Sequence, residues 1–220
     1  MLRTMATLAA VGTLALGAAA CGNDATTTAS STAGSQTASA PEPVEQIDSL
    51  SGRSTAVALD AGFVKALGTL KLTPAPVGDA KITKVGGAQF PITGGNVTYY
   101  EPGSISPYVQ GDINHDGSGL SLTGGGKTVE LTDFVVDPGA SVLTGKVTVD
   151  GEVAAESAPL FFLDGRTLEP LQAEGSTAVL QGTTVKLKEE AAMLLNDTFK
   201  TDALAGGLVI GVAKITVNTV

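Results

Sequence analysis

The middle of the chain alternates apolar and polar residues in short runs, and glycine-containing turns separate the runs. A period of two places every second side chain on one face of a strand, so each run predicts a β-strand with one buried face. Turn signals such as Gly94-Gly95, Asp137-Pro138-Gly139 and Asp150-Gly151 recur at near-regular spacing. The predicted strands cover 90–93, 96–100, 108–113, 119–123, 128–136, 141–149 and 159–163.

Both flanks of this region are predicted to form strand–helix–strand units. On the N-terminal side, 54–59 predicts a strand, Asp60 is a suitable N-cap for a short helix, 73–76 is a proline-containing loop, and 77–83 is a strand. On the C-terminal side, the same pattern predicts a strand at 184–187, a helix at 189–199 and a strand at 210–216. The predicted fold is mainly β: one domain over 53–220, an antiparallel β-sandwich or barrel with two short helices.

The first twenty residues have the organisation of a secretory signal peptide. Arg3 precedes a short apolar run that ends in Ala18-Ala19-Ala20, immediately before Cys21, and Cys21 is the chain's one cysteine. This junction resembles the bacterial lipoprotein signal, in which the cysteine is lipidated and becomes the mature N-terminus. Ala18-x-Ala20 also fits ordinary signal peptidase cleavage, so that alternative stays open. We expect an exported protein that is anchored to the membrane through a lipid on Cys21.

Residues 21–52 are rich in Thr, Ser, Ala and Pro. From Gly22 to Leu50 the segment contains acids and no lysine or arginine. A segment of this composition buries too little apolar surface to fold by itself, so it predicts a disordered tether between the anchor and the domain.

Charge and residue usage exclude several classes of function. The formal net charge is −9, and removing residues 1–20 makes it −10 because Arg3 is their one charged residue. This acidic balance argues against nucleic acid as a partner. One histidine, one cysteine at the anchor and no Gly-x-Ser-x-Gly motif argue against an enzyme and against a zinc site.

The sharpest local motif is 112–117, in which Asp112, Asn114 and Asp116 alternate ahead of Gly117. Oxygen ligands at the first, third and fifth positions followed by glycine are typical of a calcium loop. The twelfth position should carry a bidentate carboxylate, and here it is Thr123. The missing carboxylate favours a polar hairpin turn over a calcium site.

The segments 114–122, 129–134, 182–196 and 199–202 together resemble the haem-transport-associated (HtaA-type) domains of actinobacteria. The resemblance implies a two-sheet β fold with short helices. It also implies extracytoplasmic haem binding through an axial tyrosine that a histidine supports. His115 occupies the position of the family's histidine, whereas 59–67 replaces the segment that carries its tyrosine and contains none.

We therefore expect a binding domain for haem or another hydrophobic ligand, with His115 as the ligand-binding residue. Tyr99, Tyr100 and Tyr108 are the chain's three tyrosines. Tyr108 lies seven residues before His115 and is the candidate to reach a shared pocket. The alternative is a structural or adhesive surface domain without a small ligand. The sequence does not indicate the oligomeric state.

Lipidation of Cys21 is directly testable in cells. We expect the wild-type protein to partition into the detergent phase and to resist salt washing, because the several acyl chains of a lipoprotein give stable attachment. Cys21→Ser should block processing or release soluble protein. Wild-type protein recovered from the medium with a free Cys21 thiol would contradict the anchor.

Overall fold

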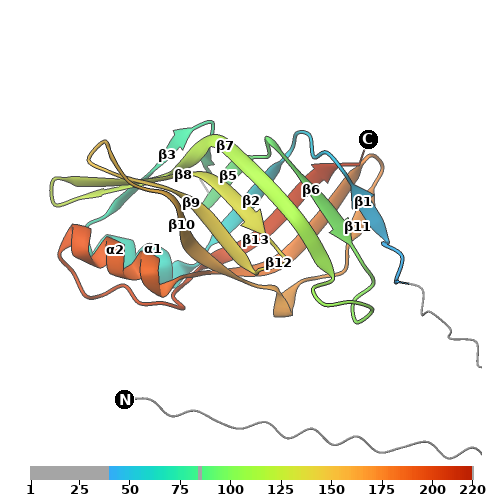
Figure 1. The fold of residues 1–220 in the computed structure, drawn as a ribbon. Helices are drawn as coiled ribbons and strands as arrows, with labels where there is room; N and C mark the ends of the chain where they lie inside the picture. Colours follow the sequence, from blue (N-terminus) through green and yellow to red (C-terminus); the bar gives the residue numbers. More distant parts are fainter. Residues whose placement is uncertain (1–39, 84–85, 220) are drawn as a thin grey trace, which may run out of the picture. The chain divides into compact units, whose positions relative to one another are not determined.

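A computed structural model describes residues 40–83 and 86–219, and these form a mainly β fold with two helices (Figure 1). The predicted class is therefore confirmed. The helices are α1 (Ala61–Thr69) and α2 (Glu189–Phe199), with a short 3₁₀ helix, η1 (Gly165–Thr167). The strands are β1 (Glu45–Ile47), β2 (Ser54–Leu59), β3 (Thr73–Gly78), β4 (Lys81–Ile82), β5 (Gly87–Pro91), β6 (Gly94–Tyr99), β7 (Val109–Gly124), β8 (Lys127–Asp137), β9 (Val142–Val149), β10 (Glu152–Asp164), β11 (Gln172–Glu174), β12 (Thr177–Leu187) and β13 (Val209–Asn218).

All the strands of the described chain belong to one antiparallel sheet rather than to two stacked sheets. Its order is β1-β6-β7-β8-β9-β10-β12-β13-β2-β5-β4, with β11 paired to β12 and β3 paired to β7. The sheet curls into a half-barrel whose inner face is apolar (Figure 1). The two-sheet arrangement that the family resemblance implied is thus replaced by a single curled sheet.

The two helices form where the sequence predicted them. Asp60 caps α1, because its side-chain oxygen accepts hydrogen bonds from the backbone N–H groups of Gly62 (2.7 Å) and Phe63 (3.2 Å). Glu189 and Glu190 occupy the first turn of α2, where negative charge stabilises the helix dipole.

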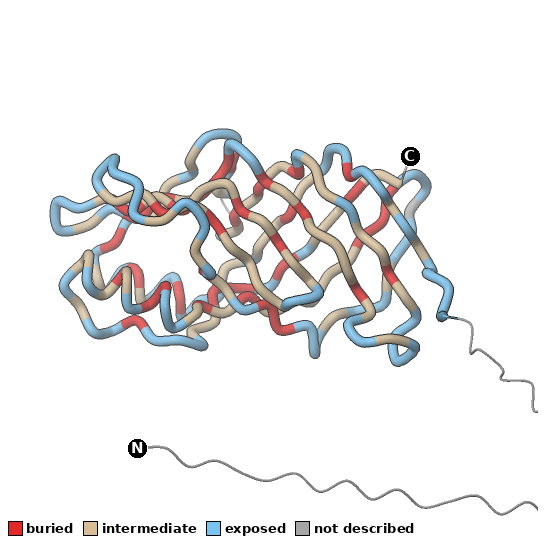
Figure 2. Tube along the Cα trace, in the orientation of Figure 1, coloured by how far each residue is buried: buried red, intermediate tan, exposed pale blue. Residues whose placement is uncertain are grey.

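Both helices bury one face against the same end of the sheet, α1 on β13 and β3, and α2 on β10 and β8 (Figure 1). Buried residues follow the inner faces of the helices and the strands above them (Figure 2). They include Phe63 and Leu67 of α1, Leu195 of α2, and Leu160 of β10. This end of the half-barrel is filled by side chains.

The predicted turn at 112–117 is wrong. The segment lies inside one long strand, β7, which replaces the two strands expected at 108–113 and 119–123. The pairing of β7 with β8 shifts between His115 and Gly119, and Gly117 has a φ of 69° there. Glycine adopts this backbone without strain, so a β-bulge accommodates the turn-like residues and the strand continues.

The predicted loop at 73–76 is also wrong, because it forms the start of β3. This strand pairs with β7 on one side, with Thr73 opposite Thr123 and Gly78 opposite Ser118. Proline is tolerated in an edge strand, where its missing N–H faces away from the ladder. The strand predicted at 77–83 is divided between β3 and β4.

The folded part of the described chain also begins before residue 53, the predicted start of the domain. β1 pairs with β6, placing Glu45 opposite Tyr99 and Ile47 opposite Val97. Leu50 is buried in the core. A strand of three residues and a single buried leucine do not change the composition of a Thr/Ser/Pro-rich segment. The domain boundary that was predicted from composition therefore lies too late in the chain.

Candidate functional site

An apolar cavity of about 630 Å³ lies inside the curled sheet. Ten strands contribute to its wall together with the connections 106–108, 138–141 and 165–171, and no residue of α1 or α2 lines it. Its volume lies within the range of about 300–1,000 Å³ that is typical of small-molecule sites. The cavity is therefore the candidate functional site.

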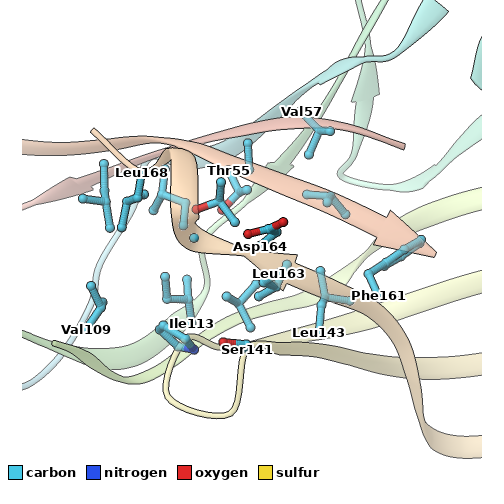
Figure 3. A pocket seen from close by; sticks show the side chains of 18 of the residues that line it. Thr55, Val57, Val109, Ile113, Ser141, Leu143, Phe161, Leu163, Asp164 and Leu168 are labelled. Carbon is cyan, nitrogen blue, oxygen red and sulfur yellow. The ribbon is translucent and has the colours of Figure 1, made fainter. Parts of the chain in front are cut away.

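The alternation that predicted the strands also explains why the wall is apolar. Inward positions carry Val57 on β2, Ile113 on β7, Leu143 on β9, and Phe161 and Leu163 on β10, whose side chains appear around the cavity in Figure 3. Successive residues of a strand point to opposite faces, so one apolar face of each strand becomes wall.

His115 is the polar residue most deeply buried in the wall, with 1% of its surface exposed. Its Nε2 is 2.8 Å from Thr55 Oγ1, and its Nδ1 is 3.3 Å from the carbonyl oxygen of Phe134. A carbonyl can only accept, so Nδ1 carries the proton and Nε2 accepts from the Thr55 hydroxyl. Burial lowers the pKa of His115 to about 4, which keeps the imidazole neutral at neutral pH.

Tyr108 lines the same cavity from the connection that precedes β7. Its ring packs edge to face on the ring of Tyr99, with centroids 5.9 Å apart. Burial and the neighbouring Tyr99 raise the pKa of the Tyr108 phenol, so the phenol is protonated at neutral pH.

The structure places His115 and Tyr108 in the wall of one cavity. His115 lies seven positions after Tyr108, so at about 3.3 Å per residue of extended chain their backbones are about 23 Å apart. A histidine that supports an axial tyrosine must lie within hydrogen-bond reach of it. In this structure the ring nitrogens of His115 bond to Thr55 and Phe134 instead, and a joint role of His115 and Tyr108 in binding a ligand stays a prediction.

A charged cluster at the cavity was not expected from the sequence. Asp164, at the end of β10, accepts hydrogen bonds from Arg166 Nε (2.9 Å), Arg166 Nη2 (2.5 Å) and Lys186 Nζ (2.8 Å). These cations hold the pKa of the Asp164 carboxyl well below its usual range. The spacing Asp164-x-Arg166 was the one sequence signal, but Lys186 joins the cluster only through the β10–β12 pairing.

The residues of the proposed calcium motif lie along β7 rather than around a loop. Asp112 Oδ1 accepts from Asn96 Nδ2 at 3.0 Å, Asp116 Oδ2 accepts from Thr93 Oγ1 at 3.0 Å, and the half-buried Asn114 lies between them. Across the described ranges, no group of three or more His, Cys, Asp or Glu side chains could hold a metal ion.

Cys21 and the predicted signal peptide lie outside the described residues. No helix in the described part of the chain is long and apolar enough to cross a membrane.

The buried neutral His115 predicts a specific dependence of stability on pH. Its pKa of about 4 in the folded state lies below the ordinary value of 6.5, so between these values the unfolded chain binds a proton that the folded chain does not. The free energy of unfolding should therefore fall by up to about 3 kcal/mol as pH decreases from 6.5 to 4. Urea unfolding of the wild type and of His115→Gln across this window measures the difference.

The free energy of unfolding of His115→Gln should depend less on pH over that window than that of the wild type. The contribution of Asp164 does not interfere, because a carboxyl with a lowered pKa loses its stabilisation only below its ordinary value of 3.8. Parallel profiles for the wild type and the variant would show that His115 is not held neutral.

No known family model matches the chain, and no curated protein matches it by sequence. The comparison with solved structures does find similar folds. The C-terminal domain of HtaA from Corynebacterium glutamicum aligns with a TM-score of 0.54 and 14% identity, over 77% of this chain and 98% of that domain. The domain-swapped dimer of its H434A variant aligns with a TM-score of 0.47 and 15% identity, over 73% and 92% of the two chains. The first alignment confirms the predicted resemblance at the level of the fold: the chain has the fold of the HtaA C-terminal domain.

Proposed function

We propose that this protein binds a hydrophobic small molecule in the cavity of its half-barrel, on the extracytoplasmic side of the membrane to which Cys21 anchors it. The cavity is the single observation that carries the proposal. Protein interiors are close-packed and rarely contain voids much larger than a water molecule. A cavity of about 630 Å³ with an apolar wall therefore has the character of a binding site rather than of a packing defect.

The uneven filling of the half-barrel supports this function over a purely structural role. One end of the sheet is closed by α1 and α2 and is densely filled, with Leu160, Val129 and Val147 almost inaccessible. A domain that served only as a rigid spacer would gain stability by filling the remaining space too, because each buried CH₂ group contributes about 0.8 kcal/mol.

The contacts of His115 support binding rather than catalysis. His115 has both ring nitrogens engaged by Thr55 and Phe134. His115 is buried, and burial lowers its pKa to about 4, so the imidazole is a weak base toward the Thr55 hydroxyl that donates to it. The pair instead links β2, β7 and β8 across the cavity wall.

The location is proposed from the sequence. The signal-peptide pattern ahead of Cys21 and the Thr/Ser/Pro-rich composition of the residues after it support an exported, tethered domain. A tether lets the domain capture a poorly soluble ligand near the membrane surface.

Blocking the cavity tests the function. Val57 lies half-buried in the wall, so Val57→Trp should place a bulky ring inside the cavity (Figure 3). We expect N-phenyl-1-naphthylamine, a neutral dye that fluoresces in apolar surroundings, to bind the wild type at least about tenfold more tightly than Val57→Trp. Fluorescence titration measures both affinities.

Val64→Trp is the matched control. Val64 lies on α1, is 49% exposed and does not line the cavity, so the same substitution there should leave dye binding unchanged. Circular dichroism confirms that both variants are folded. Equal dye affinities for the wild type and Val57→Trp would show that the cavity is not the binding site.

Haem is the second candidate ligand, and the fold shared with the HtaA C-terminal domain favours it. Because both ring nitrogens of His115 are engaged, we expect the iron ligand to be Tyr108, which lines the same cavity. Haemin should then give a saturable one-to-one Soret band that weakens in Tyr108→Phe and is lost in Val57→Trp.

His115→Gln is the control for haem ligation, and it should leave the Soret band unchanged in position. A featureless spectrum that none of these substitutions alters would indicate adsorption to the surface and would remove haem from consideration.

A further inference from the structure

The cluster of Asp164, Arg166 and Lys186 carries more positive charge than its carboxylate needs. Two cations surround one acid, which leaves one positive charge locally in a protein whose net charge is −9. Lys186 and the backbone N–H of Arg166, at 2.8 and 3.2 Å, already satisfy Asp164. The Arg166 side chain is thus not the sole partner of the buried carboxylate.

Arg166 is also open to water, unlike its partner. Its side chain is 82% exposed, whereas that of Asp164 is 9% exposed. Arg166 donates two of its five N–H groups to Asp164, and among the described residues no other acceptor uses the rest. The contact with Asp164 orients the guanidinium while it leaves donors available for a ligand.

Arg166 places this positive charge at the wall of the cavity. Arg166 lies in η1, which follows β10, and it lines the cavity together with Gly165 and Leu168. It is the one cationic side chain in the described wall. The other acid there, Glu45, belongs to β1 and forms no ion pair with the described residues of this cluster.

We propose that the ligand is an amphiphile with one anionic head group, a carboxylate or a phosphate, which Arg166 binds while the apolar body fills the cavity. This inference rests on the proposed function. The planar fork of a guanidinium matches both head groups with two parallel hydrogen bonds. Since Arg166 is exposed, the head remains partly hydrated and avoids the cost of burying a charge.

The test compares ligands that share a long saturated chain and carry an anionic or a neutral head group. Dodecanoate, dodecyl phosphate and the neutral methyl dodecanoate each displace N-phenyl-1-naphthylamine from the wild type at neutral pH. We expect the two anions to bind about fivefold to tenfold more tightly than the ester, the range for charge-assisted hydrogen bonds at an exposed site. The preference should shrink as salt is added, because salt screens an exposed charge.

Arg166→Gln should abolish the preference and leave the affinity for the ester unchanged, which also shows that the cavity is intact. Arg166→Lys keeps a positive charge beside Asp164 but loses the fork, and it should reduce the preference.

Lys127→Gln is the matched control. Lys127 forms an exposed ion pair with Asp150 at 2.7 Å, at the opposite end of the β8–β9 hairpin from the cavity-lining turn 138–141. Losing this cation should leave the preference intact.

The outcomes separate the two proposals. If neither the anions nor the ester displaces the dye, the proposed function itself fails. If anions and ester bind the wild type equally, or if Lys127→Gln lowers the preference as much as Arg166→Gln, hydrophobic binding stands and the head-group site is overturned.

Discussion

A single antiparallel sheet has to cover its own apolar face, and most features of this protein follow from how it does so. The sheet curls so that β2, β7, β10 and β13 all turn their apolar residues inward. Two short helices are enough to cover only one end. The remaining inner face encloses a cavity, so the same apolar alternation produces a packed core at the helical end and an apolar cavity elsewhere.

His115 shows how a buried polar residue can support this arrangement. It lies on β7, donates to a carbonyl of β8 and accepts from Thr55 of β2, sixty residues away in the sequence. Phe90 of β5 packs edge to face on its ring at 6.4 Å. A buried polar group without partners would cost free energy, so these contacts both satisfy the imidazole and hold four strands in register. His115, whose binding of a ligand stays a prediction, is in this structure a part of the cavity wall that links neighbouring strands.

The binding mode that we propose combines two kinds of interaction, one from the apolar wall of the cavity and one from the charged cluster. The apolar wall supplies affinity that scales with buried area and has little directional preference. Arg166, oriented by Asp164, supplies direction and selects charge. Tyr108, whose phenol stays protonated at neutral pH, adds a neutral hydrogen-bonding group to the cavity. Such a combination suits a ligand with one apolar and one polar end.

The sequence by itself determined the elements whose signals are local. Alternation located β6, β8, β9 and β13, and Asp60 and the Glu189-Glu190 pair marked the starts of α1 and α2, because a cap or a period acts within a few residues. Only the tertiary structure decided the rest. Pairing with β8 turned the turn-like segment 112–117 into part of a bulged strand, and pairing with β7 made the proline-containing β3 an edge strand. Curling of the sheet placed His115 against Thr55, and strand pairing brought Lys186 to Asp164, because contacts between distant residues depend on topology that local patterns do not encode.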